Sequence, residues 1–423
     1  MSSRFHAATP HSIFSKLEDL ARVSGLIQRH SHKFSAGGFL FALIQCATRG
    51  NSSFQHLATS QAGFEHLPMT RQGMSERLNP RSSEFLVRVM NELLSDDAKG
   101  ASSSPFQRIL IEDSTVISMA KCNAEHFPNN GNGKIDTAGC KINLVTDSVS
   151  GQPVSAGLHD ARNPDQTIGF DLPSICRAGD LIVRDRGYFS LDALEEIERR
   201  DAFWISRLPA TLTCFDGEGT YLDEILKTTK SSRLDMDIWI GRHRAHRCRL
   251  IATQLSAKET EKNRRQRHRD SKRHQTTASK RGLIQDGWSL IITSVEDDRI
   301  DPDQIYKLYS IRWSIEIQFR AMKQSNQLHH SLNHRTDPFL IEALVLAVLI
   351  RQLLTIDLQV RLNDSLPPDK RVSIEKLSDA YSHHFLTRTQ ENLRESFRYD
   401  LRHLIHEKRK RPTLYAATVQ CLA

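Results

Sequence analysis

The chain has 423 residues, 39% hydrophobic and 26% charged, a composition typical of a folded soluble protein with room for two or three domains. Its formal net charge of +8 permits nucleic-acid binding without requiring it. The seven cysteines lie far apart with no Cys-x2-Cys pair, which argues against a zinc ribbon or a disulfide framework and favours reduced thiols in a cytoplasmic protein.

No segment of the sequence is expected to enter a membrane. The first residues, MSSRFHAATPHS, lack the apolar stretch of a signal peptide. The longest apolar stretch, from Phe339 to Ile350, contains Glu342 and is too short to span a bilayer. We therefore expect a buried helix there and no membrane partner.

Residues 1–104 are predicted to form a helical N-terminal region that binds DNA. An apolar segment at 39–46 precedes short helices separated by Gly63 and Pro68, and polar residues from Thr70 onward open the last of these helices. This pattern fits a helix-turn-helix. A plain helical bundle fits the same pattern.

From Phe106 the apolar residues take on the pattern of β-strands. Three successive strands are expected in RILIEDSTVISM, CKINLVTDS and GQPVSAGL, followed by a helix with Asn163 as N-cap and Pro164 in its first position. A fourth strand in LIVRD, a helix in SLDALEEIERR and a fifth strand in AFWISRL come next. This order predicts a mixed α/β sheet rather than a simple alternating doubly wound fold.

Residues 208–286 are too many for a loop in a compact domain, so we expect an inserted, β-rich and basic module. Its strand-like segments are DIWIGRH and CRLIATQL. Between residues 258 and 281 there are ten Lys or Arg against three acids, and Arg264, Arg265 and Arg267 lie in this run. Such a run is usually a solvated surface, but its position near the candidate site favours a contact with DNA phosphates.

Residues 301–325 are predicted to form one helix that begins with the capping sequence Asp-Pro-Asp-Gln. The helix carries Tyr309, Arg312, Glu316 and Lys323. At about 100° per residue, these four side chains fall within roughly 60° of one another. A single exposed Arg–Glu ion pair would explain part of this cluster. Whether the cluster belongs to a functional site therefore depends on two acids upstream.

Those acids are Asp113, in the middle of the first strand, and Asp185, at the end of the fourth strand in VRDRGYF. A lone carboxylate in an apolar strand is costly unless it is paired or binds a metal. Together with Glu316 they supply the oxygen ligands that two Mg²⁺ ions take up beside a substrate phosphate. Two such ions, ~3.5–4 Å apart, can catalyse in-line phosphoryl displacement.

Tyr309, Arg312 and Lys323 share the predicted face of Glu316, so we expect them to bind the scissile phosphate or its neighbours. The pattern therefore predicts metal-dependent phosphoryl transfer on DNA. A nuclease that cuts without joining is one alternative. An inactive DNA-binding remnant is another, although the three intact acids argue against it.

These residues resemble the DDE transposases of bacterial insertion sequences, in the group marked by a Tyr-Arg-Glu-Lys motif around the third acid. The matching segments are IEDSTVI at Asp113, VRDRGYFS at Asp185, GWSLIITS and YSIRWSIEIQFRAMK. The resemblance implies a ribonuclease-H-like core at 105–207 and 287–335. The insertion interrupts this core, and residues 336–423 form a helical C-terminal region suited to dimerisation.

The resemblance also implies an activity. The enzyme would cut the terminal inverted repeats of an insertion sequence and join the freed 3′-OH ends to target DNA. The three acids Asp113, Asp185 and Glu316 would hold two Mg²⁺ ions, or Mn²⁺ in their place. A homodimer in a synaptic complex with double-stranded DNA, both transposon ends and target, is expected.

Trp288 precedes a predicted strand, and in this family a tryptophan at that place can receive a base flipped from a DNA hairpin. Stacking on the indole, worth ~1–3 kcal/mol, would offset part of the cost of extruding the base. Simple packing at the start of the strand explains Trp288 as well.

Overall fold

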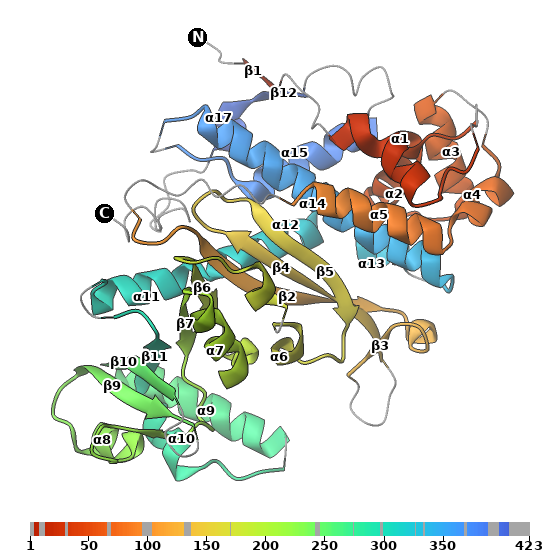
Figure 1. The fold of residues 1–423 in the computed structure, drawn as a ribbon. Helices are drawn as coiled ribbons and strands as arrows, with labels where there is room; N and C mark the ends of the chain where they lie inside the picture. The colour runs from red at the N-terminus through yellow and green to blue at the C-terminus, as the bar shows by residue number, and fades with distance from the viewer. Residues whose placement is uncertain are drawn as a thin grey trace. The chain divides into compact units, whose positions relative to one another are not determined.

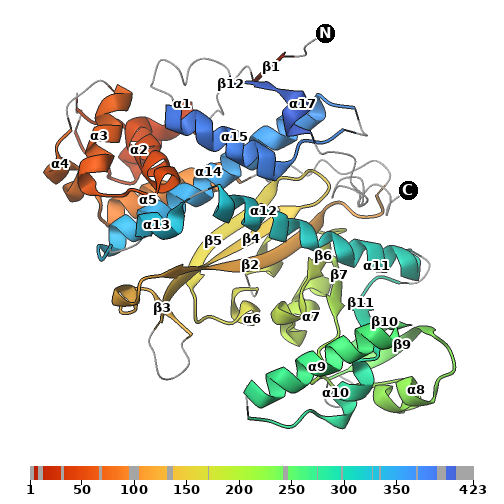
Figure 2. The same cartoon turned by 180° about the vertical axis from the view of Figure 1, so that it is seen from behind.

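The computed structural model describes residues 4–7, 13–29, 33–65, 69–94, 104–130, 137–169, 171–241, 246–273, 275–296, 299–325, 327–332, 335–367, 370–387 and 397–405. The chain divides into two compact units, each assembled from separate stretches of sequence (Figures 1 and 2). The first unit comprises Met1–Ala98, Asp113–Asn163 and Trp313–Ala416. The second comprises Lys99–Glu112, Pro164–Arg312 and Ala417–Ala423.

The first unit is organised around helix α14 (Pro338–Asp364), which packs against α5 (Pro80–Glu92), α2 (Ala36–Arg49) and α15 (Ile374–Thr387). With 27 residues it is far longer than the apolar stretch predicted from the sequence, and by length and composition alone it could cross a membrane. However, 89% of its most apolar window is buried inside the protein. The prediction of a buried helix is confirmed, and the helix extends well beyond the apolar stretch that indicated it.

The N-terminal part of this unit is helical, as predicted. Gly63 does not separate two helices, because it lies inside α3; Pro68 lies outside the described residues. The side chain of Thr70 caps α4 by accepting a hydrogen bond from the Gly73 amide at 3.0 Å. A helix-turn-helix role stays a prediction. The remaining elements of the unit's helical part are α1 (Ile13–Val23), α3 (Phe54–Glu65), α4 (Arg71–Arg77), α13 (Leu328–Leu332), α17 (Leu401–Leu404) and the strand pair β1 (Arg4–Ala7) and β12 (Phe397–Asp400).

The three consecutive strands expected after Phe106 are present as β2 (Ile109–Met119), β4 (Thr137–Asp147) and β5 (Pro153–Asp160). β4 pairs antiparallel with β5 and with the short β3 (Pro128–Asn129), and it neighbours β2. Helices α5 and α14 contact β5, so this sheet belongs to the same core as the helices (Figure 1).

The second unit continues the sheet from the first residues of β2, which pair in parallel with β6 (Leu181–Arg184). β6 pairs in parallel with β7 (Phe203–Arg207), and α7 (Leu191–Arg199) connects them. The pairing order β5-β4-β2-β6-β7 is the one expected of a ribonuclease-H-like core. The predicted mixed α/β fold class is therefore confirmed.

The inserted segment extends the sheet of the second unit. β11 (Trp288–Thr293) pairs antiparallel with β7, and beyond it come β10 (His246–Gln254), β9 (Arg233–Ile240) and β8 (Cys214–Phe215). Three helices complete the segment: α8 (Leu222–Thr228), α9 (Ala257–Arg273) and α10 (Lys280–Gln285). The basic run predicted from the sequence is helix α9.

The predicted helix start at Asn163 is wrong in detail. Helix α6 covers only Asp165–Ile168, its N-cap residue is Pro164, and no side chain caps it. Lys141 instead donates a hydrogen bond to the backbone carbonyl of Asn163 at 2.7 Å. By contrast, the capping box predicted for the helix after Asp301 is confirmed, with Gln304 as its partner.

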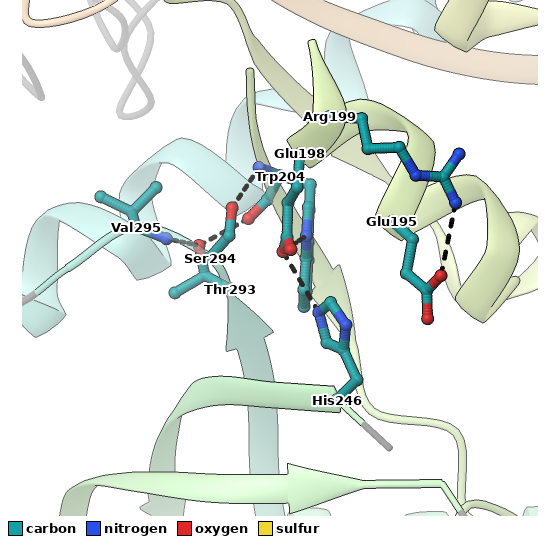
Figure 3. A network of polar contacts seen from close by, with 8 residues as sticks. All are labelled: Glu195, Glu198, Arg199, Trp204, His246, Thr293, Ser294 and Val295. Atoms are coloured by element: carbon teal, nitrogen blue, oxygen red, sulfur yellow. Dashed lines mark hydrogen bonds and ion pairs between the residues drawn. The ribbon is translucent and has the colours of Figure 1, made fainter. Parts of the chain in front are cut away.

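A polar network ties β10 of the insertion to α7 and β7 (Figure 3). One carboxylate oxygen of Glu198 accepts from the indole Nε1 of Trp204 at 2.8 Å and lies 3.1 Å from His246 Nε2. The Trp204 backbone amide donates to Ser294 at 3.0 Å, and the hydroxyl of Thr293 donates to the Trp204 carbonyl. Because Glu198 can pair with a charged imidazole, this network depends on the protonation of His246.

The stability of the second unit is expected to depend on pH through His246. Its hydrogen bond to Glu198 raises its pKa above the ordinary value of 6.5. Because the folded-state pKa is higher than the unfolded one, the stabilisation is complete below pH 6.5 and is lost as the pH rises through the raised value. The Tm difference between the wild type and His246→Asn should be a few degrees at pH 6 and smaller at pH 8.5. A constant difference across this range would contradict the assignment.

Candidate active site

The first two candidate acids follow a buried ion pair on neighbouring parallel strands. Glu112 is the last residue of β2 that belongs to the second unit, and it is the register partner of Arg184 in β6. The two side chains form an ion pair at 2.9 Å. These side chains are 1% and 2% exposed. The residues that follow them in the chain are Asp113 and Asp185.

Two further contacts fix this strand pairing. At the other end of the same strands, the guanidinium of Arg108 forms a buried bidentate ion pair with Asp180. Arg184 also donates to the carbonyl of Gly169. A Cβ added at Gly169 would lie 2.8 Å from the Tyr188 ring and 3.3 Å from Arg184 Nη2, so glycine is needed for this close approach. The first residues of β2, Ile109–Glu112, are therefore held in one register with β6.

Asp185 lies just beyond β6 with a side chain that is 43% exposed. Its Oδ1 accepts a hydrogen bond from the Tyr309 hydroxyl at 3.0 Å, and Arg312 Nε lies 4.0 Å away. Burial and the nearby negative charge of Asp185 raise the pKa of Tyr309 to about 12. The hydroxyl is thus protonated at neutral pH and acts as a donor to the carboxylate.

The predicted single helix at 301–325 is wrong, because the structure divides it into α11 (Pro302–Ile311) and α12 (Trp313–Gln324). Arg312 between them keeps helical dihedral angles, φ −48° and ψ −35°. Tyr309 and Arg312 belong to the second unit, whereas Glu316 belongs to the first. The four-residue face expected for one continuous helix is therefore carried by two elements.

Glu316 and Lys323 lie on α12 in the first unit, which also contains Asp113. Glu316 is in the first turn of the helix, where the helix dipole favours a carboxylate. Lys323 Nζ donates to the backbone carbonyl of Val116 in β2 at 3.1 Å. Desolvation lowers the pKa of Lys323 below its ordinary value of 10.5.

The other predicted DNA contacts lie elsewhere in the second unit, Trp288 at the start of β11 and the three arginines on helix α9 of the inserted segment. Trp288 is 9% exposed and pairs with Gln254 at the start of β11. This burial agrees with the alternative that Trp288 simply packs at the start of its strand. Arg267 makes a bidentate ion pair with Asp286, with both contacts at 2.7 Å. Arg265 pairs with Glu261 on the helix surface, and Arg264 lies 3.4 Å from the Leu283 carbonyl. Their DNA contacts stay predictions.

Reasoning from the sequence missed Glu112 and Arg184 as a positioning pair. Both are charged residues inside otherwise apolar strands, ILIED and LIVRD, and each immediately precedes a candidate acid. A buried charge is tolerated only with a partner, so this matched pattern was the available signal.

The candidate acids have the oxygen chemistry that a hard divalent cation prefers. In the parts of the chain that the structure describes, no three His, Cys, Asp or Glu side chains form a ready-made metal cluster. A Mg²⁺ site does not require one, because Mg²⁺ binds through one or two carboxylates together with waters and substrate phosphates. The donor set therefore fits a metal that arrives with the substrate.

Comparisons with known proteins identify the family of this chain. Residues 104–353 match the family model "Transposase DDE domain". The transposase of insertion sequence element IS231C from Bacillus thuringiensis subsp. berliner is 30% identical, over 76% of this chain and 72% of its own length. The IS231B transposase from the same organism is 27% identical over 76% of this chain and 73% of that protein.

A more distant relative and a solved structure are also similar. The transposase of insertion sequence element IS1151 from Clostridium perfringens is 22% identical over 73% of this chain and 71% of its own length. The piggyBac transposase, solved in a synaptic complex with hairpin DNA, matches 90% of this chain and 78% of its own, with a TM-score of 0.47 and 12% identity. The family match covers more than half of the chain and includes all three candidate acids. The chain belongs to the DDE transposase family and is an insertion-sequence transposase, an enzyme that cuts and joins DNA.

Proposed function

We propose that Asp113, Asp185 and Glu316 are the three catalytic acids of this transposase. The observation that carries the proposal is the in-register pairing of Glu112 with Arg184, since the chain runs from each of these residues directly into one of the two aspartates. Buried partners of this kind hold the residues next to them in the chain rigidly, and catalytic groups need to be held within a fraction of an ångström of the productive geometry.

The three carboxylates would hold two Mg²⁺ ions, with Mn²⁺ as a substitute. DDE transposases typically depend on divalent metal ions. When bound, such ions lower the pKa of an attacking oxygen and neutralise charge on the transferred phosphoryl group. The chain's own part is to present the carboxylates, and Tyr309 holds one of them, Asp185, by a hydrogen bond at 3.0 Å.

The DNA substrate proposed is the pair of terminal inverted repeats of an insertion sequence, whose freed 3′-OH ends are joined to target DNA by a homodimer in a synaptic complex. Incubation with end-containing duplex, target plasmid and Mg²⁺ tests this directly. Joined products support transposition. Cut ends without joining would instead indicate a nuclease, and gel shifts without cutting would indicate a binding remnant.

We assign the chain to the Tyr-Arg-Glu-Lys group within the family, on the strength of Tyr309, Arg312, Glu316 and Lys323. Arg312 and Lys323 would contact phosphates near the acids. A stacking role for Trp288 would require its buried indole to become accessible. This role stays a prediction.

Tyr309→Phe should lower the rate of end cleavage about 10- to 100-fold. The substitution removes only the hydroxyl that donates to Asp185, and a hydrogen bond to a charged group is worth ~1.5–3 kcal/mol. DNA binding, measured by gel shift without metal, should not change. Tyr306→Phe is the matched control, because its hydroxyl donates to the Ser289 carbonyl at 2.9 Å rather than to an acid. Equal losses in the two variants would show that only packing is affected.

A further inference from the structure

Helix α9 (Ala257–Arg273) has two different faces. Its half-buried residues are Thr260, Asn263, Arg267 and Ser271, which recur at the spacing of one side of a helix. The opposite side carries only exposed residues, and five of them are cations within an arc of roughly 80° at 100° per residue. We call these five the α9 basic stripe: Lys258, Lys262, Arg265, Arg269 and Lys272.

The inner face attaches the helix to the rest of the insertion. Arg267 makes its bidentate ion pair with Asp286, and Asn263 Nδ2 donates to the Asp286 carbonyl at 3.2 Å. A Cβ added at Gly282 would lie 2.6 Å from Arg267 Nη1, so the glycine leaves room for the guanidinium. These contacts determine which side of α9 faces outward.

Most cations of the outer face make no ion pair or side-chain hydrogen bond within the described residues. In the described part of the chain, no ion pair or hydrogen bond of the side chain holds Lys262, Arg269 or Lys272. Arg265 pairs only with Glu261, and both side chains are more than half exposed, so this pair holds it weakly. Five cations on one exposed face repel one another, which is a cost unless a polyanion covers them.

We propose that the α9 basic stripe is a binding surface for the phosphate backbone of double-stranded DNA. From Lys258 to Lys272 the stripe is about 21 Å long at 1.5 Å per residue. That length corresponds to roughly six phosphates of one strand at 3.4 Å per step. The proposal rests on the DNA partner proposed above and assigns the contact to these five residues, with Arg267 as the residue that positions the helix.

A membrane surface fits this helix poorly. An interfacial membrane helix needs a broad apolar face beneath its basic one. The sequence of α9, AKETEKNRRQRHRDSKR, has no apolar residue after its first alanine. The stripe is therefore suited to a hydrated polyanion such as duplex DNA.

The test compares two double variants that remove equal charge from the insertion. Lys262→Gln with Lys272→Gln alters the stripe, and Lys227→Gln with Lys230→Gln alters exposed lysines outside it. Binding of a 30-base-pair duplex without end sequence is measured by fluorescence anisotropy in EDTA across a series of salt concentrations. The stripe variant should bind roughly tenfold more weakly at low salt, and its slope of log K against log salt should be smaller by about 1.8. The control variant should match the wild type.

Arginine at both stripe positions should restore the wild-type slope, which excludes misfolding as the cause of the loss. An unchanged slope in the stripe variant, or equal losses in the two double variants, would overturn the proposal. So would weaker binding to phosphatidylserine vesicles with unchanged DNA binding. Because no metal is present, failure of the catalytic assignment would leave this measurement unaffected.

Discussion

Replacing Asp113 by Asn is expected to lower the rate of end cleavage by at least about 10³-fold while DNA binding stays close to that of the wild type. Loss of a metal ligand removes several kcal/mol of transition-state stabilisation, and each 1.36 kcal/mol corresponds to a factor of ten. Asp185→Asn and Glu316→Gln should behave in the same way. Cleavage is measured on end-containing duplex with Mg²⁺, and binding on the same duplex in EDTA.

The control for this series is Asp192→Asn in the first turn of α7. Asp192 is an exposed acid in the same unit as Asp185, so it tests whether loss of any nearby negative charge has the same effect. Its cleavage rate should stay within about twofold of the wild type, since surface substitutions usually act weakly. Substantial cleavage by any of the three acid variants would exclude that residue from the catalytic set.

The strands of the core could be predicted from the sequence because their signal is local. Alternating or continuous apolar residues between turn signals identify a strand without knowledge of its neighbours, as in the segments around Asp113 and Asp185. The same holds for the helix start at Asp301, where one capping sequence contains the whole interaction. These elements form as predicted.

The predictions that failed concern places where the structure is not determined by the local sequence. At Asn163 the local sequence favours a cap, but the carbonyl of this residue accepts from Lys141, which lies on another strand. The pattern at 301–325 gives no sign of an interruption at Arg312, since Ile311 and Trp313 on either side of it are both compatible with a helix. The sequence pattern therefore predicted helix on both sides of Arg312, but not the division between the two elements.

The residues of the candidate site show the same contrast between local signals and signals that depend on distant partners. Asp113 could be selected because a carboxylate in an apolar strand needs a partner, and this is a property of the residue itself. Asp185 and Glu316 were selected from the local sequences around them, VRDRGYF and the spacing of Tyr309, Arg312, Glu316 and Lys323. Arg267 could not be assigned, because it needs a specific acid elsewhere in the sequence, Asp286. The partner of Arg184 is also distant in sequence, and only the matched charges of ILIED and LIVRD pointed to Glu112. From the sequence alone, Arg267 was one more cation of a basic run. In the structure its ion pair with Asp286 attaches one side of α9, so that the basic stripe lies on the other, exposed side.

The ion pair of Glu112 and Arg184 leads to the largest expected effect on stability. Arg184→Met should lower the free energy of unfolding of the second unit by ~3–5 kcal/mol, because it removes the guanidinium that forms an ion pair with the Glu112 carboxylate, which is 1% exposed. The double variant Glu112→Leu with Arg184→Met should recover much of this loss, since a buried ion pair is often replaceable by apolar residues of similar volume.

The matched control is the exposed ion pair of Arg233 and Asp303 in the same unit, with a distance of 3.1 Å and side chains 68% and 63% exposed. Arg233→Met should cost less than about 1 kcal/mol, as surface pairs do. Hydrogen exchange of the β6 amides reports the stability of the strand itself, so it separates this effect from unfolding elsewhere in the chain. If Arg184→Met and Arg233→Met lowered protection of β6 equally, the buried pair would not be what holds β6 against the first residues of β2.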